Sequence, residues 1–255
     1  MPAGSGVNIR RGRFVPRHGM VLAAGLGLRM RPITDKLPKP LVPILDRTLL
    51  DRALDRLEEA GVREAVVNVH HLGEMIEQHL SKRRTPKITL SVEETRLETG
   101  GGVAKALPLL GDGPFVVANG DVLWLDGPRP TIERLAAAWD DDRMDALLLL
   151  HPTVEAFGYR GDGDFLMDPE GRLVRRPERE VAPYLFAGVQ ILHPRLFEDE
   201  PEGPFSLNLL YDRAIERGRL FGVLHDGKWF HVGTPEDLAM AESYMQASHS
   251  GIRRR

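Results

Sequence analysis

Two glycines and an arginine form a candidate phosphate-binding turn after the first apolar segment of the chain. They stand in Leu22-Ala-Ala-Gly-Leu-Gly-Leu-Arg-Met-Arg-Pro32, where Gly25 and Gly27 precede Arg29. Because glycine has no side chain, the backbone N–H groups of such a turn can approach phosphate oxygens closely. The guanidinium of Arg29 offers a bidentate fork to the same oxygens. An ordinary tight turn would also use two glycines, so the pattern alone leaves both interpretations open.

A single lysine follows this turn in a segment that contains three prolines. Lys39 stands in Leu37-Pro-Lys-Pro-Leu-Val-Pro43. Proline fixes φ and lacks an N–H group, so we expect a rigid, extended loop. A lysine held on such a loop, close behind a phosphate cradle, is suited to pair with a phosphate. The alternative is a solvated loop lysine.

The elements that must position these residues alternate between strand-like and helix-like segments as far as residue 150. Apolar runs predict strands over residues 20–24, 65–69, 87–92, 114–118 and 145–150, and helical spacing predicts helices over 48–60, 72–80, 102–110 and 131–139. This order implies a largely parallel sheet with helices on both faces. Ligands bind outside the carboxyl ends of such strands. That rule draws attention to residues 25–31 and 119–121.

The pattern changes after residue 151. Residues 157–177 are rich in Gly, Asp and Arg, which predicts short antiparallel strands joined by turns. Further segments predict strands over 184–192, 220–224 and 229–232 and helices over 206–217 and from Pro235, capped by Thr234. We expect a basic N-terminal extension over residues 1–19 and a single domain over residues 20–248.

Composition and charge exclude several classes of function. The 255 residues include no cysteine, which excludes disulfides, zinc–thiolate sites and thiol nucleophiles. The net charge of the chain is −3. Seven positive charges lie near its ends, four arginines in the first 19 residues and three in the last three, so the rest of the chain carries a net charge of about −10. An acidic body argues against nucleic-acid binding. The longest aliphatic run is far shorter than the ~18 residues of a membrane span. We expect a cytoplasmic protein that is a monomer or a weak dimer.

The first two motifs together resemble the opening of the sugar-1-phosphate nucleotidyltransferases. Leu97-Glu-Thr-Gly-Gly-Gly102, Val117-Ala-Asn-Gly-Asp121 and His231-Val-Gly-Thr-Pro235 follow in the order and spacing of that family. The resemblance covers roughly residues 20–245. The Leu-Glu-Thr-Gly-Gly-Gly form is most similar to the branch that contains N-acetylmuramate 1-phosphate uridylyltransferases of peptidoglycan recycling. Bacterial mannose-1-phosphate guanylyltransferases are also similar.

The resemblance implies a fold and a division of the domain. The fold is a three-layer, Rossmann-like α/β nucleotidyltransferase fold with a mixed, mainly parallel sheet. A small antiparallel portion lies on the sugar side. Residues 20–150 would then bind the nucleotide, and residues 151–248 would form the sugar-phosphate side.

The resemblance also implies site residues. The catalytic residues would be Arg29, Lys39 and Asp121. The nucleotide-binding residues would be Leu22, Ala23, Ala24, Gly25, Gly27, Leu28, Arg29, Lys39, Thr99, Gly100, Gly101 and Asn119, with Thr99, Gly100 and Gly101 bordering the base. The sugar-binding residues would be Asp164, Phe186 and Gly188. Asp121 would bind Mg²⁺.

The chemistry of the implied reaction agrees with these residue types. An oxygen of the sugar phosphate attacks the α-phosphorus of a nucleoside triphosphate, and pyrophosphate leaves. Such transfer needs positioning and charge neutralisation more than covalent help. Arg29, Lys39 and a Mg²⁺ on Asp121 would supply both. The attacking phosphate is already anionic, so we assign no general base.

His231 departs from the family pattern, which usually has a metal-binding aspartate at this position. Magnesium prefers oxygen ligands, and imidazole favours softer ions such as Mn²⁺. Three hypotheses follow: His231 ligates a metal other than Mg²⁺, it contacts the phosphates while Asp121 and the substrates hold Mg²⁺, or the site is impaired.

The function we predict is uridylyl transfer from UTP to a sugar 1-phosphate, with N-acetylmuramate 1-phosphate as the favoured acceptor and Mg²⁺ as the cofactor. The same reaction with GTP and mannose 1-phosphate, or with another sugar phosphate, is the first alternative. The second is a non-catalytic protein that binds nucleotides or sugars.

Overall fold

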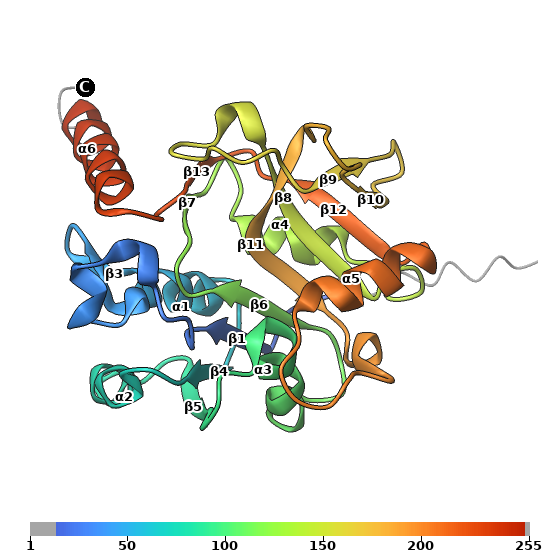
Figure 1. Cartoon of the computed structure of the whole chain (residues 1–255), viewed down its shortest axis with the longest axis horizontal. Coiled ribbons are helices and arrows are strands. Elements are labelled where there is room, and N and C mark those ends of the chain that lie inside the picture. The colour runs from blue at the N-terminus through green and yellow to red at the C-terminus, as the bar shows by residue number, and fades with distance from the viewer. Residues whose placement is uncertain (1–13, 253–255) are drawn as a thin grey trace, which may run out of the picture.

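The computed structural model describes residues 14–252 (Figure 1). The strands are β1 (His18–Leu22), β2 (Pro43–Ile44), β3 (Arg47–Thr48), β4 (Glu64–Val69), β5 (Lys87–Val92), β6 (Phe115–Asn119), β7 (Leu123–Leu125), β8 (Ala146–Pro152), β9 (Phe165–Met167), β10 (Leu173–Arg175), β11 (Tyr184–Leu192), β12 (Leu220–Leu224) and β13 (Lys228–Phe230). The α-helices are α1 (Leu49–Glu59), α2 (Gly73–Leu80), α3 (Glu98–Ala106), α4 (Thr131–Ala138), α5 (Leu207–Glu216) and α6 (Pro235–Ile252). Most of the predicted basic extension lies outside the described residues.

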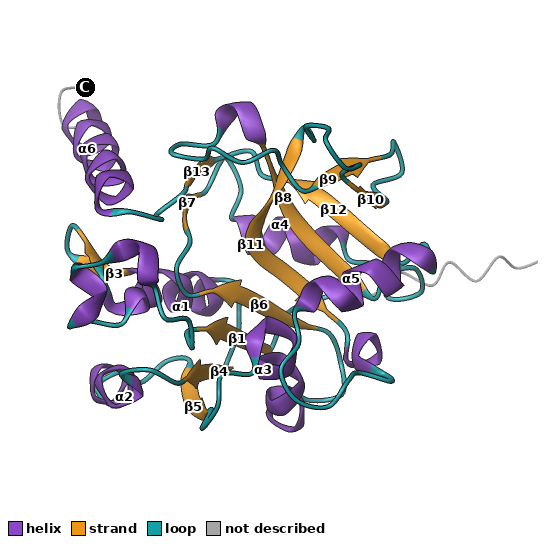
Figure 2. Cartoon of the chain, in the orientation of Figure 1, coloured by secondary structure: helices purple, strands orange, loops and turns teal. Residues whose placement is uncertain are grey.

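One mixed sheet of nine strands organises the molecule (Figure 2). Strands β5, β4, β1 and β6 are parallel neighbours, in that order. The long strand β11 pairs antiparallel with both β6 and β8, and β12 completes that side parallel to β8. The short strands β9 and β10 attach near the start of β11. This arrangement confirms the predicted α/β class and the antiparallel portion after residue 151.

Helices cover both faces of the sheet, as the alternation of side chains along the strands requires. In β6, Val116 and Ala118 belong to one buried cluster, whereas Phe115 and Val117 belong to another. We call these clusters the first and the second core. Helices α1, α2 and α4 pack on the first core and helices α3 and α5 on the second. The three-layer prediction is therefore confirmed.

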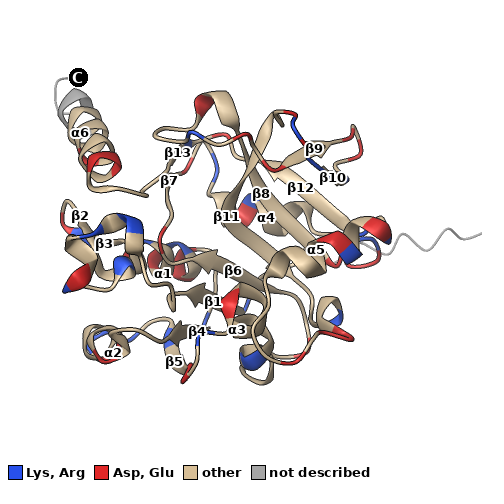
Figure 3. Ribbon diagram, in the orientation of Figure 1, with Lys and Arg blue, Asp and Glu red and all other residues tan. Residues whose placement is uncertain are grey.

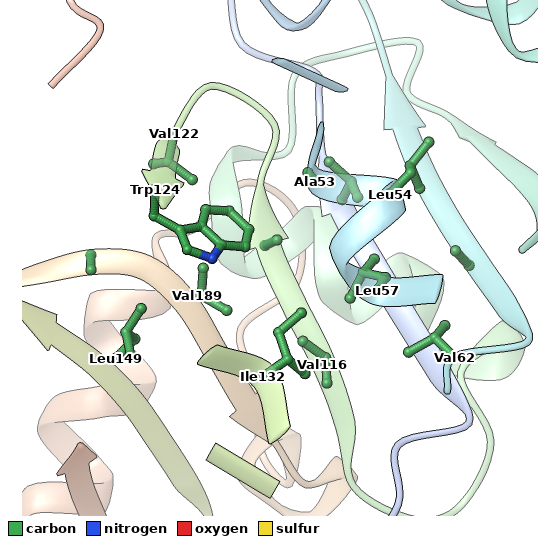
Figure 4. Close-up of a cluster of buried hydrophobic side chains, with 14 of the residues drawn as sticks. Ala53, Leu54, Leu57, Val62, Val116, Val122, Trp124, Ile132, Leu149 and Val189 are labelled. Atoms are coloured by element: carbon green, nitrogen blue, oxygen red, sulfur yellow. The ribbon is translucent and has the colours of Figure 1, made fainter. Parts of the chain in front are cut away.

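In the first core, α1 buries the apolar residues whose helical spacing predicted this helix. Leu50, Ala53, Leu54 and Leu57 recur at helical spacing and are at most 1% exposed. Figure 4 shows Leu54 and Leu57 of α1 in this cluster, with Trp124 near Val189 of β11. The hydroxyl of Thr48 accepts a hydrogen bond from Asp51 N (3.0 Å) and thereby caps the helix.

A third core joins the C-terminal helix to the glycine-rich turn. Ala241 and Met245 of α6 cluster with Met30, Ile44 and Phe230, and all five are buried. The same helix reaches the β2–β3 hairpin, where Glu242 accepts a hydrogen bond from Leu45 N (3.3 Å). Residues on both sides of the candidate site thus pack on one helix, which is distant in sequence from Met30 and Ile44 but follows closely after Phe230.

Several element boundaries differ from the predictions. Strand β1 begins at His18, before the predicted start at residue 20, and ends at Leu22, so the two alanines that follow belong to the turn. Helix α3 begins at Glu98, four residues before the predicted start, because three consecutive glycines hide its helical character. The predicted extended loop around Lys39 contains a 3-10 turn, Lys39–Leu41. The two-stranded pairs β2–β3 and β7–β13 were not predicted.

Charged residues are distributed over the outer loops and helices. In Figure 3, blue and red segments alternate over the part of the chain that is drawn in colour. Within residues 14–252, the helices are too short or too polar for a membrane span.

Candidate active site

The carboxyl ends of four parallel strands surround a cavity of about 250 Å³, which we call the first cavity. The turn after β1 contributes Leu22, Ala23, Ala24 and Gly25, and the end of β6 contributes Asn119 and Asp121. Lys39 and Thr99 complete the set of predicted residues that line it. Eight of the predicted residues, distant in sequence, are therefore brought together at the sheet edge where the topology places ligands.

The glycine-rich turn is held against the segment that carries Lys39. Gly27 adopts a left-handed conformation (φ 62°), and a Cβ at this position would lie 3.0 Å from Cβ of Lys39. The carbonyl of Gly27 accepts a hydrogen bond from Oγ1 of Thr34 (2.8 Å). Leu28 is 54% exposed, so its side chain takes little part in packing. Glycine at position 27 fixes the distance between the turn and the lysine.

Lys39 and Asp121 form the central ion pair of the site. The ammonium of Lys39 donates to Oδ2 of Asp121 over 2.7 Å. The lysine side chain is 9% exposed, whereas that of Asp121 is 43% exposed. The buried lysine therefore orients a carboxylate that keeps an accessible side. Sequence analysis predicted that Lys39 contacts phosphate and that Asp121 binds Mg²⁺, but it did not predict that the two residues contact each other.

A buried network at the back of the first cavity was missed. Oδ1 of Asn68 accepts from Ala23 N (2.8 Å), and its Nδ2 donates to Oε1 of Glu93 (2.7 Å). Oε2 of Glu93 accepts from Leu97 N (2.9 Å). The network ties together the ends of β1, β4 and β5. The strand-end rule that singled out residues 25–31 would also have found Asn68, next to last in β4.

A second cavity, about 200 Å³ in volume, opens on the other side of the Lys39–Asp121 pair. Its walls include Arg29, Lys39, Asn119, Asp121, Val122, Tyr159, Leu185, Phe186, Gly188, Trp229 and His231. Gly188 has φ 78°, and a Cβ there would lie 2.6 Å from Cγ1 of Val122, so only glycine fits. The predicted residues Phe186 and Gly188 thus lie beside Asp121. Tyr159 and Trp229 were not predicted, because only long-range strand pairing brings them here.

His231 faces Arg29 across this second cavity. Its Nε2 lies 3.5 Å from NH1 of Arg29, and its backbone N–H donates to the carbonyl of Phe157 (2.8 Å). Burial, reinforced by Arg29 and Lys39, lowers the pKa of His231 below the ordinary value of 6.5. The ring is therefore neutral at pH 7, and a neutral ring nitrogen can accept a hydrogen bond from the guanidinium.

A third cavity, of about 590 Å³, adjoins the second. Arg29, Tyr159 and His231 line both cavities, so the two share a wall. The remaining wall of the third cavity comes from the turn after Phe157 and from the first turn of α6, namely Gly158, Arg160, Gly161, Thr234, Glu236 and Asp237.

Five predicted site residues line none of the three cavities, namely Gly27, Leu28, Gly100, Gly101 and Asp164. Gly100 and Gly101 lie in α3, and both N–H groups donate to the carbonyl of Phe205 (2.8 and 3.2 Å). Oδ2 of Asp164 accepts a hydrogen bond from Phe186 N (2.8 Å), which ties the turn before β9 to β11. These residues support the walls, and direct contact between them and a ligand stays a prediction.

The described residues contain no group of three or more His, Cys, Asp or Glu side chains arranged to hold a metal ion. Asp121 therefore offers a single carboxylate. Magnesium is commonly bound by one or two carboxylates together with phosphates of the substrate, so this donor set fits a Mg²⁺ shared with substrate.

Comparison with known proteins gives a consistent assignment. The family model described as nucleotidyl transferase matches residues 18–248. The chain is 44% identical over 233 residues to N-acetylmuramate alpha-1-phosphate uridylyltransferase of Caulobacter vibrioides, a match that covers 89% of this chain and 96% of that protein. It is 37% identical over 230 residues to the protein of the same name from Neisseria meningitidis serogroup B, covering 88% and 96%.

A solved structure also shares the fold. HddC from Yersinia pseudotuberculosis, in complex with GMP-PN, superposes with a TM-score of 0.72 at 22% identity. The match covers 90% of this chain and 99% of the other. At that identity, the likeness concerns the fold.

Proposed function

The chain belongs to the nucleotidyl transferase family and is a sugar-1-phosphate nucleotidyltransferase, and we propose that its substrates are UTP and N-acetylmuramate 1-phosphate. The products would be UDP-N-acetylmuramate and pyrophosphate. The observation that carries the proposal is the Lys39–Asp121 pair, which stands between two cavities. Such an arrangement suits a reaction between two phosphates bound from opposite sides.

We assign the nucleotide to the first cavity and the sugar phosphate to the second. The turn after β1 and Thr99 line the first cavity. The aromatic rings of Phe186 and Trp229 line the second, and apolar faces of this kind suit a sugar ring. Arg29 lies only in the second and third cavities, where it can meet the acceptor phosphate.

The residues then act by positioning and by neutralising charge. The acceptor phosphate oxygen attacks the α-phosphorus, the bond to the β-phosphate breaks, and pyrophosphate carries away the negative charge. Lys39 and Arg29 offset the charge that accumulates on the non-bridging oxygens. Because the attacking oxygen is ionised at neutral pH, the chain needs no group to remove a proton.

Mg²⁺ is the cofactor we propose, with Asp121 as its protein ligand. The accessible carboxylate of Asp121 is oriented by Lys39 and leaves the other coordination positions to phosphate oxygens and water. When bound, the ion would neutralise phosphate charge. Mn²⁺ is the alternative that the nearby imidazole suggests.

We propose that His231 positions Arg29 rather than completing a protein-only metal site. A neutral imidazole 3.5 Å from the guanidinium can hold it toward the acceptor phosphate. This role differs from the three hypotheses for the replaced aspartate, and it shares with the second the expectation that Asp121 and the substrates hold Mg²⁺. Because N-acetylmuramate is a peptidoglycan sugar, we also propose a role in peptidoglycan recycling in the cytoplasm.

The test is pyrophosphate release from UTP and N-acetylmuramate 1-phosphate with Mg²⁺. We expect release that requires both substrates and falls by at least ~100-fold in Asp121→Asn, which keeps the side-chain shape but loses the charge. Circular dichroism of the variant controls for folding. If pyrophosphate were released only from GTP and mannose 1-phosphate, the protein would be a guanylyltransferase instead. If neither substrate pair released pyrophosphate with Mg²⁺ or with Mn²⁺, the protein would be a non-catalytic binding protein.

A further inference from the structure

The proposed acceptor carries a charge that most sugar 1-phosphates lack. N-acetylmuramate is N-acetylglucosamine with a lactyl ether on O3, and the lactyl carboxylate is ionised at neutral pH. A carboxylate that leaves water needs a cation or several hydrogen-bond donors. In the second cavity, the cationic side chains are those of Arg29 and Lys39, beside the reacting phosphates. The lactyl carboxylate therefore needs a partner elsewhere.

The third cavity offers the space for this substituent. The second cavity, at about 200 Å³, lies below the ~300–1,000 Å³ typical of ligand sites. The third cavity is larger, about 590 Å³, and opens from the same wall of Arg29, Tyr159 and His231. A substituent on a sugar ring in the second cavity would lie close to the third, because Arg29, Tyr159 and His231 line both.

Arg160 is the cation of the third cavity that the proposed reaction does not use. Its side chain is exposed, and within the described part of the chain it forms no ion pair. The neighbouring Tyr159 fixes the turn, because its hydroxyl accepts from Gly163 N (3.2 Å) and its ring meets Trp229 and His231 edge-on at 6.2 and 6.3 Å. The backbone of Arg160 is thereby anchored beside the shared wall.

The two acids in this cavity do not neutralise Arg160. Oδ2 of Asp237 accepts hydrogen bonds from Gly233 N (3.2 Å) and Thr234 N (3.0 Å) and so caps α6. Glu236 is exposed on the first turn of that helix, and the described structure contains no ion pair between it and Arg160. A planar guanidinium with free donors is the side chain best suited to a bidentate carboxylate contact.

We propose that the third cavity is a carboxylate subsite in which Arg160 binds the lactyl group of the acceptor and thereby selects N-acetylmuramate 1-phosphate over sugar 1-phosphates that carry no carboxylate. The inference rests on the proposed function and deepens it. Arg160 contributes to binding in the ground state and in the transition state alike, so it acts on KM for the acceptor rather than on kcat.

The test compares steady-state kinetics with N-acetylmuramate 1-phosphate and with N-acetylglucosamine 1-phosphate at saturating UTP and Mg²⁺. Arg160→Ala should raise KM for N-acetylmuramate 1-phosphate by about 10–100-fold, the range of a hydrogen bond between charged groups, with kcat changed by less than about twofold. The preference for the muramate substrate should fall by the same factor. Arg160→Lys should keep part of this preference, because lysine retains the positive charge but lacks the two parallel N–H donors of the guanidinium.

Arg84→Ala is the matched control, since Arg84 is also exposed and lines none of the three cavities. Unchanged KM and preference in Arg160→Ala would overturn the subsite while the uridylyltransferase assignment stands. A wild-type protein that turns over neither sugar phosphate with UTP would overturn the proposed function, and the subsite with it.

Discussion

At the scale of single residues, the site depends on charged groups whose neighbours hold them in one orientation. Lys39 orients Asp121, and His231 faces Arg29. Each contact joins segments that are distant in sequence, by 82 residues in the first case and 202 in the second. The residue types predicted what chemistry each side chain can perform, whereas the sequence did not predict which residue it contacts.

The first prediction concerns His231→Asp. A second carboxylate beside Asp121 would add an oxygen ligand, and Mg²⁺ prefers oxygen to nitrogen. We expect the Mg²⁺ concentration for half-maximal turnover to fall by about 3–10-fold, with kcat unchanged or increased. A magnesium titration of pyrophosphate release measures this, with His231→Asn as the uncharged control. A large loss of Mg²⁺-dependent turnover in His231→Asp would contradict this prediction and would show that a carboxylate cannot replace the imidazole beside Arg29.

The second prediction concerns the pH dependence of stability. His151 is fully buried with its ring 5.6 Å from that of His225, and burial lowers the pKa of both from 6.5. Below about pH 6.5 the unfolded chain therefore binds protons that the folded chain excludes, and the free energy of unfolding decreases as the pH falls. Each such histidine removes at most ~1.4 kcal/mol per pH unit between its unfolded and folded pKa.

Urea unfolding at pH 7.5 and 5.5 tests this directly. His151→Leu should lose less stability than the wild type between these two values, by about 1 kcal/mol. His71 is exposed, so His71→Gln serves as a control that should retain the wild-type difference. If the free energy of unfolding decreased equally in the wild type and in His151→Leu, groups other than His151 would be responsible for the loss of stability at low pH.

At the scale of elements, the glycines of α3 set the distance between this helix and the loop before α5. A Cβ on Gly100 would overlap the ring of Phe205 and lie 2.9 Å from its carbonyl oxygen. A Cβ on Gly101 would lie 2.7 Å from the carbonyl oxygen of Gly203. These glycines therefore serve close packing, and Thr99 beside them reaches the first cavity as a consequence.

The third prediction is that Gly100→Ala destabilises the protein by about 1–3 kcal/mol, because the added methyl group forces backbone to move. The KM for UTP should also rise, because α3 carries Thr99, which lines the first cavity. Displacement of α3 should also disturb Leu97, whose N–H donates to Glu93 in the same cavity wall. Urea unfolding and UTP titration measure the two effects. Gly113→Ala is the control, because a Cβ there meets nothing within 4 Å. Similar behaviour of the two variants would refute the packing role.

At the scale of the whole molecule, the C-terminal helix links the two sides of the site. The third core contains Met30 next to Arg29 and Val232 next to His231, and both pack with Ala241 of α6. The active groups of the N-terminal and C-terminal halves therefore share one buried support.

The fourth prediction is that Ala241→Arg impairs both stability and turnover. Ala241 is fully buried, so an unpaired charge there must displace α6 or remain desolvated, at a cost of ~2 kcal/mol or more. Loosening the third core should lower kcat, because Arg29 and His231 lose their common anchor. Met240→Arg, at a neighbouring position that is 48% exposed, is the control and should behave like wild type. Thermal unfolding and pyrophosphate release report the two effects.

The sequence by itself determined the alternation of elements, the α/β class and most of the residues around Asp121. Apolar periodicity is a local property, so it predicts the strand 184–192 with its observed bounds and the helix 48–60 with an error of one residue at each end. Glycine and proline likewise mark turns locally, which is why Gly25, Gly27 and Lys39 could be singled out.

Only the tertiary structure decided which distant segments meet. The pairing of β13 with β7 brings Trp229 and His231 to Arg29, and the turn that carries Arg160 reaches the same place from a different part of the chain. The network of Asn68 and Glu93 also forms only when β4 and β5 lie side by side. Such contacts depend on long-range packing and on the burial of partnered polar groups, which leave no periodic signal in the segments that form them.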